Sequence, residues 1–377
     1  MGFRKYVILA RERKFKKMGY YIDTLREILP YNADVYLLIG ARGLGKTFGV
    51  RQIFVEDYIK NKIRFAVIFR SNEVKKKVSH VFFDKLISAG LFEKYVFKTD
   101  TTYAYIAEKP KNKKNKIKWS ICGYFVSLST AQNDKQIAAF DRVRNICVDE
   151  ILIKTTDIYH RYLPNEVDMV ADLIDTVTRE RPDSREMENL RKPRVFMLGN
   201  AVDLFNPYFE RYGITEPPKA GKYWLKNKTC LFVFTDDKEY GNEKAKNTVA
   251  GRMRSAEENR QNSDNLFITG NDDFIIRHPH KHIQPQFIFK WRGKKITQYT
   301  DYECGYIYLS DKPNNIKDLQ VFALTTSDNK LNYLAGNLAR EYMKNLLQYY
   351  SAGMLRYANH STQNSCIEIF RNYGIKE

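Results

Sequence analysis

A phosphate-binding loop is the clearest chemical signature in the sequence. Residues 40–47 read Gly-Ala-Arg-Gly-Leu-Gly-Lys-Thr and fit the pattern Gly-x-x-x-x-Gly-Lys-Ser/Thr. The glycines let backbone N–H groups surround phosphate oxygens, the Lys46 ammonium reaches the β and γ oxygens, and the Thr47 hydroxyl is a magnesium ligand. The sequence therefore predicts a site for ATP and Mg²⁺, formed by Gly40, Ala41, Arg42, Gly43, Leu44, Gly45, Lys46, Thr47 and Phe48.

A pair of carboxylates supplies the second half of this chemistry. Asp149 and Glu150 end the run Arg-Asn-Ile-Cys-Val-Asp-Glu, about 100 residues after the loop. We interpret this run as a Walker B segment, in which Asp149 holds Mg²⁺ opposite Thr47, directly or through water, and Glu150 polarises the water that attacks the γ-phosphate. An Asp-Glu pair alone is usually a solvated turn, so the interpretation depends on the apolar strand before it.

Two more polar side chains are candidates for the same reaction. Asn200 ends the apolar run 194–199, where it would sense the γ-phosphate or the water, or would cap the next segment. Arg179 follows the helix that ends at Thr178, and at about 100° per residue it is rotated by about 200° from Val177. It should therefore project away from its own core, either toward another molecule or to complement the helix dipole.

The elements that must position these residues alternate between strands and helices. The strand at Tyr36–Ile39, a helix to about Lys60 and a strand at Phe65–Phe69 form a βαβ unit, which predicts a largely parallel sheet. The same reasoning gives a helix at 78–89, strands at 102–107 and 117–128, and a helix at 163–178.

The chain is long enough for about two domains. We expect an α/β ATPase domain at 35–241 after a basic arm at 1–34, then a polar helical linker at 242–273 and a small α+β domain at 274–377. The smaller domain should contain strands at 287–291, 295–300, 306–309 and 319–324, with helices at 332–350 and 362–371.

The net charge of +19 favours a polyanionic partner, most simply nucleic acid. The tip at 109–116 carries Lys111, Lys113 and Lys114, which are either a polyanion contact or a solvated loop. No apolar run approaches the roughly 18 residues that span a bilayer, so we expect no membrane partner.

The five cysteines form no Cys-x-x-Cys pair, which argues against a disulfide framework and a zinc site. His278, His280 and His282 alternate as ligands on one strand face would. Pro279 interrupts them, however, and no carboxylate or cysteine spacing supports a metal site, so we do not expect one here.

Taken together, the motifs closely resemble the phi29-type genome-packaging ATPases of small tailed bacteriophages, in the additional-strand (ASCE) P-loop class. The resemblance covers most of residues 35–210 and rests on residues 38–47, 147–151, 162–167, 173–181 and 199–209. It implies a homopentameric ring at the procapsid portal in the host cytoplasm, hydrolysing ATP to drive double-stranded DNA inward. It also implies that Arg179 is a trans-acting arginine finger and that Asn200 couples the nucleotide to the neighbouring subunit. Whether a structural RNA links the ring to the portal is left open.

The resemblance further implies a vestigial, RNase H-like nuclease fold for the C-terminal domain. A working nuclease of that fold needs an aspartate in its first strand, where the run 286–292 offers Lys290 and Trp291 instead. Lys290 is therefore a candidate DNA contact. The alternatives are a terminase with an active nuclease, a ring helicase, and a basic nucleic-acid scaffold without catalysis, of which Glu150 disfavours the last.

Overall fold

The structure is a computed structural model that describes residues 21–110, 116–130, 140, 142–153, 162–163, 165–178, 191–202, 204, 206–214, 217–225, 228–235, 249–253, 272–312 and 318–373. The chain divides into two compact units, Met1–Ile268 and Thr269–Glu377. The expected linker at 242–273 lies mostly outside the described residues, which include there only α9 (Val249–Met253) and the start of η4 (Asp272–Phe274). No helix in the described part of the chain is long and apolar enough to cross a membrane.

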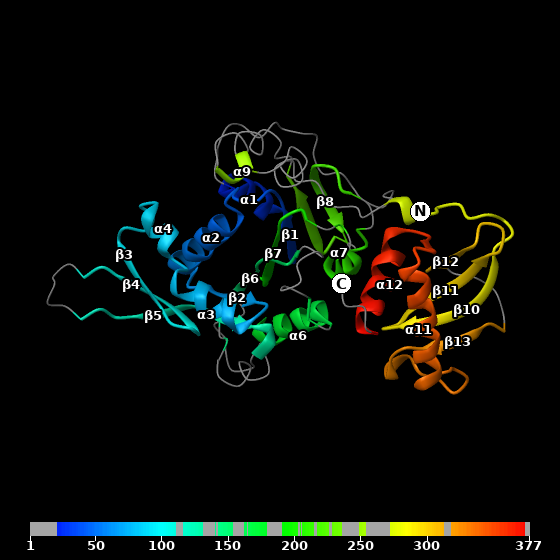
Figure 1. The fold of residues 1–377 in the computed structure, drawn as a ribbon. Helices are drawn as coiled ribbons and strands as arrows, with labels where there is room; N and C mark the ends of the chain where they lie inside the picture. Colours follow the sequence, from blue (N-terminus) through cyan, green and yellow to red (C-terminus); the bar gives the residue numbers. More distant parts are fainter. Residues whose placement is uncertain are drawn as a thin grey trace. The chain divides into compact units, whose positions relative to one another are not determined.

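Within the described residues, the first unit contains a nine-stranded sheet of order β3-β4-β5-β2-β6-β7-β1-β9-β8 (Figure 1). Neighbouring strands from β5 to β9 in this order are parallel, whereas β3, β4 and β8 pair antiparallel at the two edges. The sheet is therefore largely parallel, as the sequence predicted. The strands are β1 (Val35–Ile39), β2 (Arg64–Phe69), β3 (Tyr95–Thr99), β4 (Tyr103–Glu108), β5 (Ser120–Ser127), β6 (Val143–Val148), β7 (Arg194–Gly199), β8 (Gly221–Leu225) and β9 (Cys230–Phe234).

Helices cover both faces of this sheet, because the side chains of its central strands alternate between two apolar cores. Leu37 of β1 belongs to the core that includes Leu173 of α6, whereas Leu38 belongs to the core that includes Phe54 of α2. The described helices of the first unit, besides α9, are α1 (Ile22–Ile28), η1 (Leu29–Tyr31), α2 (Lys46–Asn61), α3 (Asn72–His80), α4 (Asp84–Ser88), η2 (Leu128–Thr130), α6 (Glu166–Thr178) and α7 (Pro207–Tyr212).

Three features of this unit differ from the sequence-based expectation. The helix expected at 78–89 is two helices, α3 and α4, and strands β3, β8 and β9 were not predicted. Residues 21–34 do not behave as an arm. Tyr21, Leu25 and Ile28 are buried against α2, where the absence of a side chain at Gly49 gives α1 room: a Cβ there would lie 2.9 Å from Leu25 Cδ1.

The second unit is a small α+β domain, as expected. Its described five-stranded sheet has the order β13-β10-β11-β12-β14, in which β10, β11 and β12 form an antiparallel meander, β13 pairs parallel with β10, and β14 parallel with β12. Two helices pack on this sheet through Phe289, Met343 and Phe370. The elements are β10 (Gln284–Trp291), β11 (Lys294–Asp301), β12 (Tyr306–Ser310), β13 (Gln320–Ala323), η5 (Thr326–Asp328), α11 (Asn337–Ser351), β14 (Leu355–Tyr357) and α12 (His360–Asn372).

Candidate nucleotide site

The phosphate-binding loop joins β1 to α2, so its backbone lies at the N-terminus of a 16-residue helix. Gly43 and Gly45 have φ values of 96° and 88°, a left-handed conformation that side chains disfavour, which is the physical reason for glycine at both positions. The start of the loop is fixed to β7 by the Gly40 N–H, which donates to the Gly199 carbonyl at 3.3 Å. The helix N-terminus and the loop N–H groups together favour a bound phosphate.

Lys46 is buried inside this loop, with 7% of its surface exposed. Its Nζ donates to the carbonyls of Gly40 at 2.8 Å and Ala41 at 2.9 Å, and to Oδ1 of Asn200 at 3.1 Å. These contacts hold the ammonium at the centre of the loop. They also place Asn200 beside the lysine, at the end of β7.

Thr47 and Asp149 meet across the same edge of the sheet. The Thr47 hydroxyl donates to Asp149 Oδ2 at 2.9 Å. Two neighbouring ligands of octahedral Mg²⁺ at roughly 2.0–2.1 Å from the ion lie about 2.9 Å apart, so this pair has the spacing and the oxygen chemistry that Mg²⁺ requires. The two residues predicted as magnesium ligands are thus brought together.

One strand separates the two halves of the site. β7 lies between β1, which carries the loop, and β6, which carries Asp149. This inserted strand is the feature from which the additional-strand class takes its name, and it brings Asn200 into line with Lys46.

Glu150 lies just beyond the end of β6. Its φ of 53° is left-handed, its side chain is exposed, and its N–H donates to Asp149 Oδ1 at 2.9 Å. Such a backbone costs about 1–3 kcal/mol and persists only where neighbours enforce it. The Ile151 N–H supplies one restraint by donating to the Leu198 carbonyl of β7 at 3.0 Å.

Arg70 supplies the second restraint, which sequence reasoning missed. From the end of β2, one of its terminal amino groups donates to the carbonyls of Glu150 at 3.1 Å and Ile151 at 3.3 Å. The same guanidinium makes a two-pronged contact with Glu166 of α6, at 2.8 Å from Nε and 2.9 Å from the terminal nitrogen. An arginine after a buried strand was visible in the sequence, but its partners were not.

Glu166 is the buried anchor of this arrangement, with 1% of its side chain exposed. Besides Arg70, its carboxylate accepts hydrogen bonds from the Tyr208 hydroxyl at 2.8 Å and the Leu163 N–H at 2.9 Å. Burial, with the Glu166 carboxylate adding to it, raises the pKa of Tyr208 well above its usual value, so this hydroxyl stays a donor. The hydrogen bonds of Arg70 and Glu166 therefore connect β2, α6 and α7 to the backbone at Glu150.

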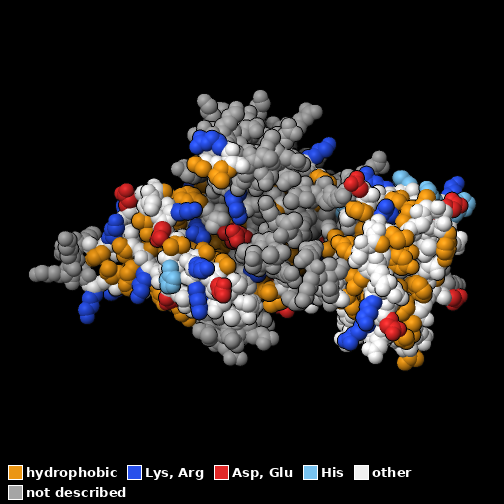
Figure 2. All heavy atoms as spheres, viewed as in Figure 1, with side chains coloured by type: hydrophobic (Ala, Val, Ile, Leu, Met, Phe, Trp, Pro, Cys, Tyr) orange, Lys and Arg blue, Asp and Glu red, His pale blue; other side chains and the backbone are white. Residues whose placement is uncertain are grey.

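Not every predicted site residue is placed. Arg179 lies just past α6 and outside the described residues, and so do Lys111, Lys113 and Lys114. Lys290 lies on β10, where its Nζ is 5.2 Å from the centroid of the Tyr333 ring. Over the first unit, Figure 2 shows Lys and Arg side chains interspersed with a few carboxylates around α2 and α3.

Comparison with known proteins agrees with this geometry. The family model of the podovirus DNA encapsidation protein (Gp16) matches residues 16–375. The chain belongs to this family. It is 26% identical to the DNA packaging proteins of Bacillus phages B103 and phi29, over 93% of this chain and 100% and 97% of those proteins. A chain of the bacteriophage phi29 viral genome packaging motor assembly shares its fold, with a TM-score of 0.63 and 22% identity over 93% of this chain and 98% of that one. The resemblance inferred from the motifs is confirmed.

Proposed function

We propose that this DNA packaging protein is an ATPase that drives double-stranded DNA into a preformed procapsid. Packaging follows from membership of the family, whereas hydrolysis and its coupling to DNA movement are the proposal. One observation carries it. Lys46, Thr47, Asp149 and Glu150, which come from two distant segments, converge at one edge of the sheet.

Each residue has a task in this reaction. Lys46 and the N–H groups of the loop bind the β- and γ-phosphates of ATP, and Thr47 and Asp149 hold Mg²⁺. When bound, Mg²⁺ neutralises charge on the phosphates. Glu150 orients the attacking water and accepts its proton, because its exposed carboxylate stands just beyond the strand end that carries Asp149.

Kinetics of two variants test the assignments. We expect Lys46→Ala to weaken nucleotide binding, because it removes the cation at the centre of the loop. Glu150→Gln should bind ATP normally and hydrolyse almost none. The measurements are nucleotide affinity and ATP turnover, with and without double-stranded DNA. Hydrolysis at the wild-type rate by Glu150→Gln would move the role in polarising water to another residue.

The assembly we propose is a homopentameric ring at the portal vertex, in the host cytoplasm, with Arg179 of each subunit completing the site of its neighbour. The position of Arg179 just past α6 supports this, and Asn200 beside Lys46 is suited to report the state of the phosphates. When the two variants are mixed, some neighbouring subunits pair an Arg179→Ala chain, which has an intact Glu150, with a Glu150→Gln chain, which has an intact Arg179. Mixing the two inactive variants should therefore restore some ATPase activity. A mixture that exchanges subunits and stays inactive would place Arg179 in its own subunit.

For the second unit we propose an RNase H-like, non-cleaving domain that contacts DNA. Side chains alternate along β10, so Phe289 and Trp291 face the core under α11 and α12 while Lys290 faces the other side of the sheet. Lys290 is paired directly with Lys295 of β11. Like charges placed opposite each other are destabilising, so their pairing favours a polyanion at this surface. We propose the lysine-rich tip at 109–116 as a second DNA contact. Neutralising Lys111, Lys113 and Lys114 together, and measuring DNA affinity, would test it.

A further inference from the structure

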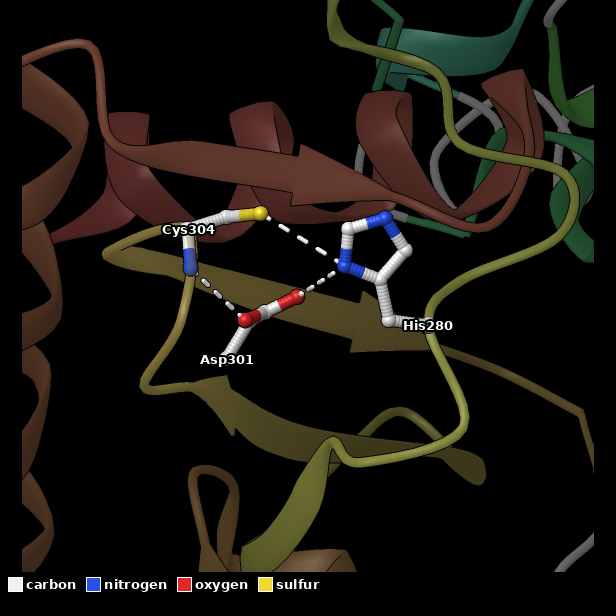
Figure 3. A group of neighbouring side chains, drawn as sticks. All are labelled: His280, Asp301 and Cys304. Carbon is white, nitrogen blue, oxygen red and sulfur yellow. Dashed lines mark hydrogen bonds and ion pairs between the residues drawn. The ribbon is translucent and has the colours of Figure 1, made fainter.

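Three potential metal ligands converge in the second unit, although they are not neighbours in the sequence. His280 comes from the segment before β10, Asp301 from the end of β11, and Cys304 from the turn between β11 and β12. Figure 3 shows the three side chains pointing toward one another. Among the described residues, this is the group of His, Cys and carboxylate side chains whose donor atoms all lie within 4.8 Å of one another.

The separations are those of ligands on one tetrahedral ion. Nδ1 of His280 lies 3.2 Å from Asp301 Oδ2 and 3.5 Å from Cys304 Sγ. With Zn–N and Zn–O bonds of about 2.0–2.1 Å and a Zn–S bond of about 2.3 Å, tetrahedral geometry requires about 3.3 Å between N and O and about 3.6 Å between N and S. The observed distances agree with both.

The carboxylate of Asp301 is divided between two tasks. Its Oδ1 accepts the N–H groups of Glu303 at 3.0 Å and Cys304 at 2.9 Å, which shapes the turn that presents the thiol. The other oxygen, Oδ2, is buried and has no hydrogen bond of regular geometry within the described residues. A buried carboxylate oxygen therefore lies beside an imidazole and a thiol, a combination of ligand types that suits a transition-metal ion.

We propose that His280, Asp301 and Cys304 bind a zinc-class divalent ion. The donor set decides the class, because a thiolate with an imidazole and a carboxylate suits Zn²⁺, whereas Mg²⁺ and Ca²⁺ prefer oxygen ligands alone. Three protein ligands leave the fourth position of the ion to water. The ion fastens the segment before β10 to the β11–β12 turn, on the sheet face that also presents Lys290 and Lys295.

The thiol provides a direct measurement on the full-length protein. Cys304 is exposed, and the other four cysteines are buried, so alkylation of the native protein reports on Cys304. Zn²⁺ at micromolar concentration should slow this alkylation, and Co²⁺ should give a thiolate-to-cobalt absorption band. Co²⁺ at Thr47 and Asp149 would give no such band, because that site has no sulfur.

Two variants separate this site from adventitious binding. Losing one ligand should weaken Zn²⁺ binding by at least about tenfold, because loss of a mere supporting partner already costs 10–100-fold. We expect this for His280→Ala, while the matched control His278→Ala, an exposed histidine two residues away, should bind as wild type does. Alkylation that Zn²⁺ does not slow, or equal protection in His280→Ala and wild type, would overturn the proposal.

Discussion

Replacing Arg70 by lysine should lower both the stability of the first unit and its proposed ATPase turnover. In the wild type one guanidinium bridges Glu166 and the carbonyls of Glu150 and Ile151. A lysine ammonium is a point charge that can keep the pairing with Glu166 but cannot also span both carbonyls. At roughly 0.5–1.5 kcal/mol for each lost hydrogen bond, Arg70→Lys should lower the free energy of unfolding by about 1–3 kcal/mol.

The effect on turnover should be comparable in free energy. The backbone at Glu150, which has a left-handed φ of 53°, loses a restraint, and displacing the proposed catalytic group by about 1 Å costs on the order of 100-fold in rate. We therefore expect kcat to fall by about 10- to 100-fold. The KM for ATP should change little, because the Arg70 guanidinium contacts Glu166, Glu150 and Ile151, which lie outside the phosphate-binding loop.

Arg70→Ala and Arg211→Lys complete the experiment. Arg70→Ala leaves the Glu166 charge buried without its cation, so it should cost about 3–5 kcal/mol and lower the melting temperature sharply. Arg211 pairs with Asp168 at the surface of the same unit, with 44% and 60% of the side chains exposed, so Arg211→Lys should leave both properties nearly unchanged. The assays are thermal unfolding and steady-state ATP turnover. A folded Arg70→Lys protein with the wild-type kcat would refute the argument that Arg70 positions Glu150.

Three further predictions follow from other parts of the chain. Gly123→Ala should destabilise the first unit by at least about 1–3 kcal/mol in denaturant unfolding, since the new Cβ would lie 2.2 Å from the buried Phe65 ring; unchanged stability would show that the ring has room to move. DNA affinity should fall steeply with salt concentration and show no sequence preference. Changing Lys290 and Lys295 to glutamine should reduce the slope of log affinity against log salt concentration by about 2. An unchanged slope would show that this surface does not contact DNA. With Mg²⁺ or Mn²⁺ the protein should leave plasmid DNA uncut, and nicking that Asp311→Asn abolishes would contradict the non-cleaving assignment.

The sequence alone predicted which side chains meet at the loop edge of the large sheet, and their role in binding a nucleotide stays a prediction. A phosphate-binding loop is a local device, whose glycines, lysine and threonine meet their backbone requirements within eight residues. The partners at Asp149 and Asn200 were predictable because parallel strands end at one edge of a sheet, so polar residues after apolar strands gather there. The contacts Thr47–Asp149 and Lys46–Asn200 show that these side chains lie together at that edge.

Only the tertiary structure decided what depends on pairing between distant segments. In the edge strands β3 and β8, Lys98 and Lys222 interrupt the apolar residues, so neither a continuous apolar run nor a regular alternation marks these strands in the sequence. Arg70 and Glu166 are 96 residues apart, so no local pattern relates them. The same holds for His280, which lies 24 residues from Cys304 and acquires its neighbours through the turn that closes β11. Local spacing reports on groups that one loop or helix brings together, whereas a site assembled across a sheet requires the register of its strands.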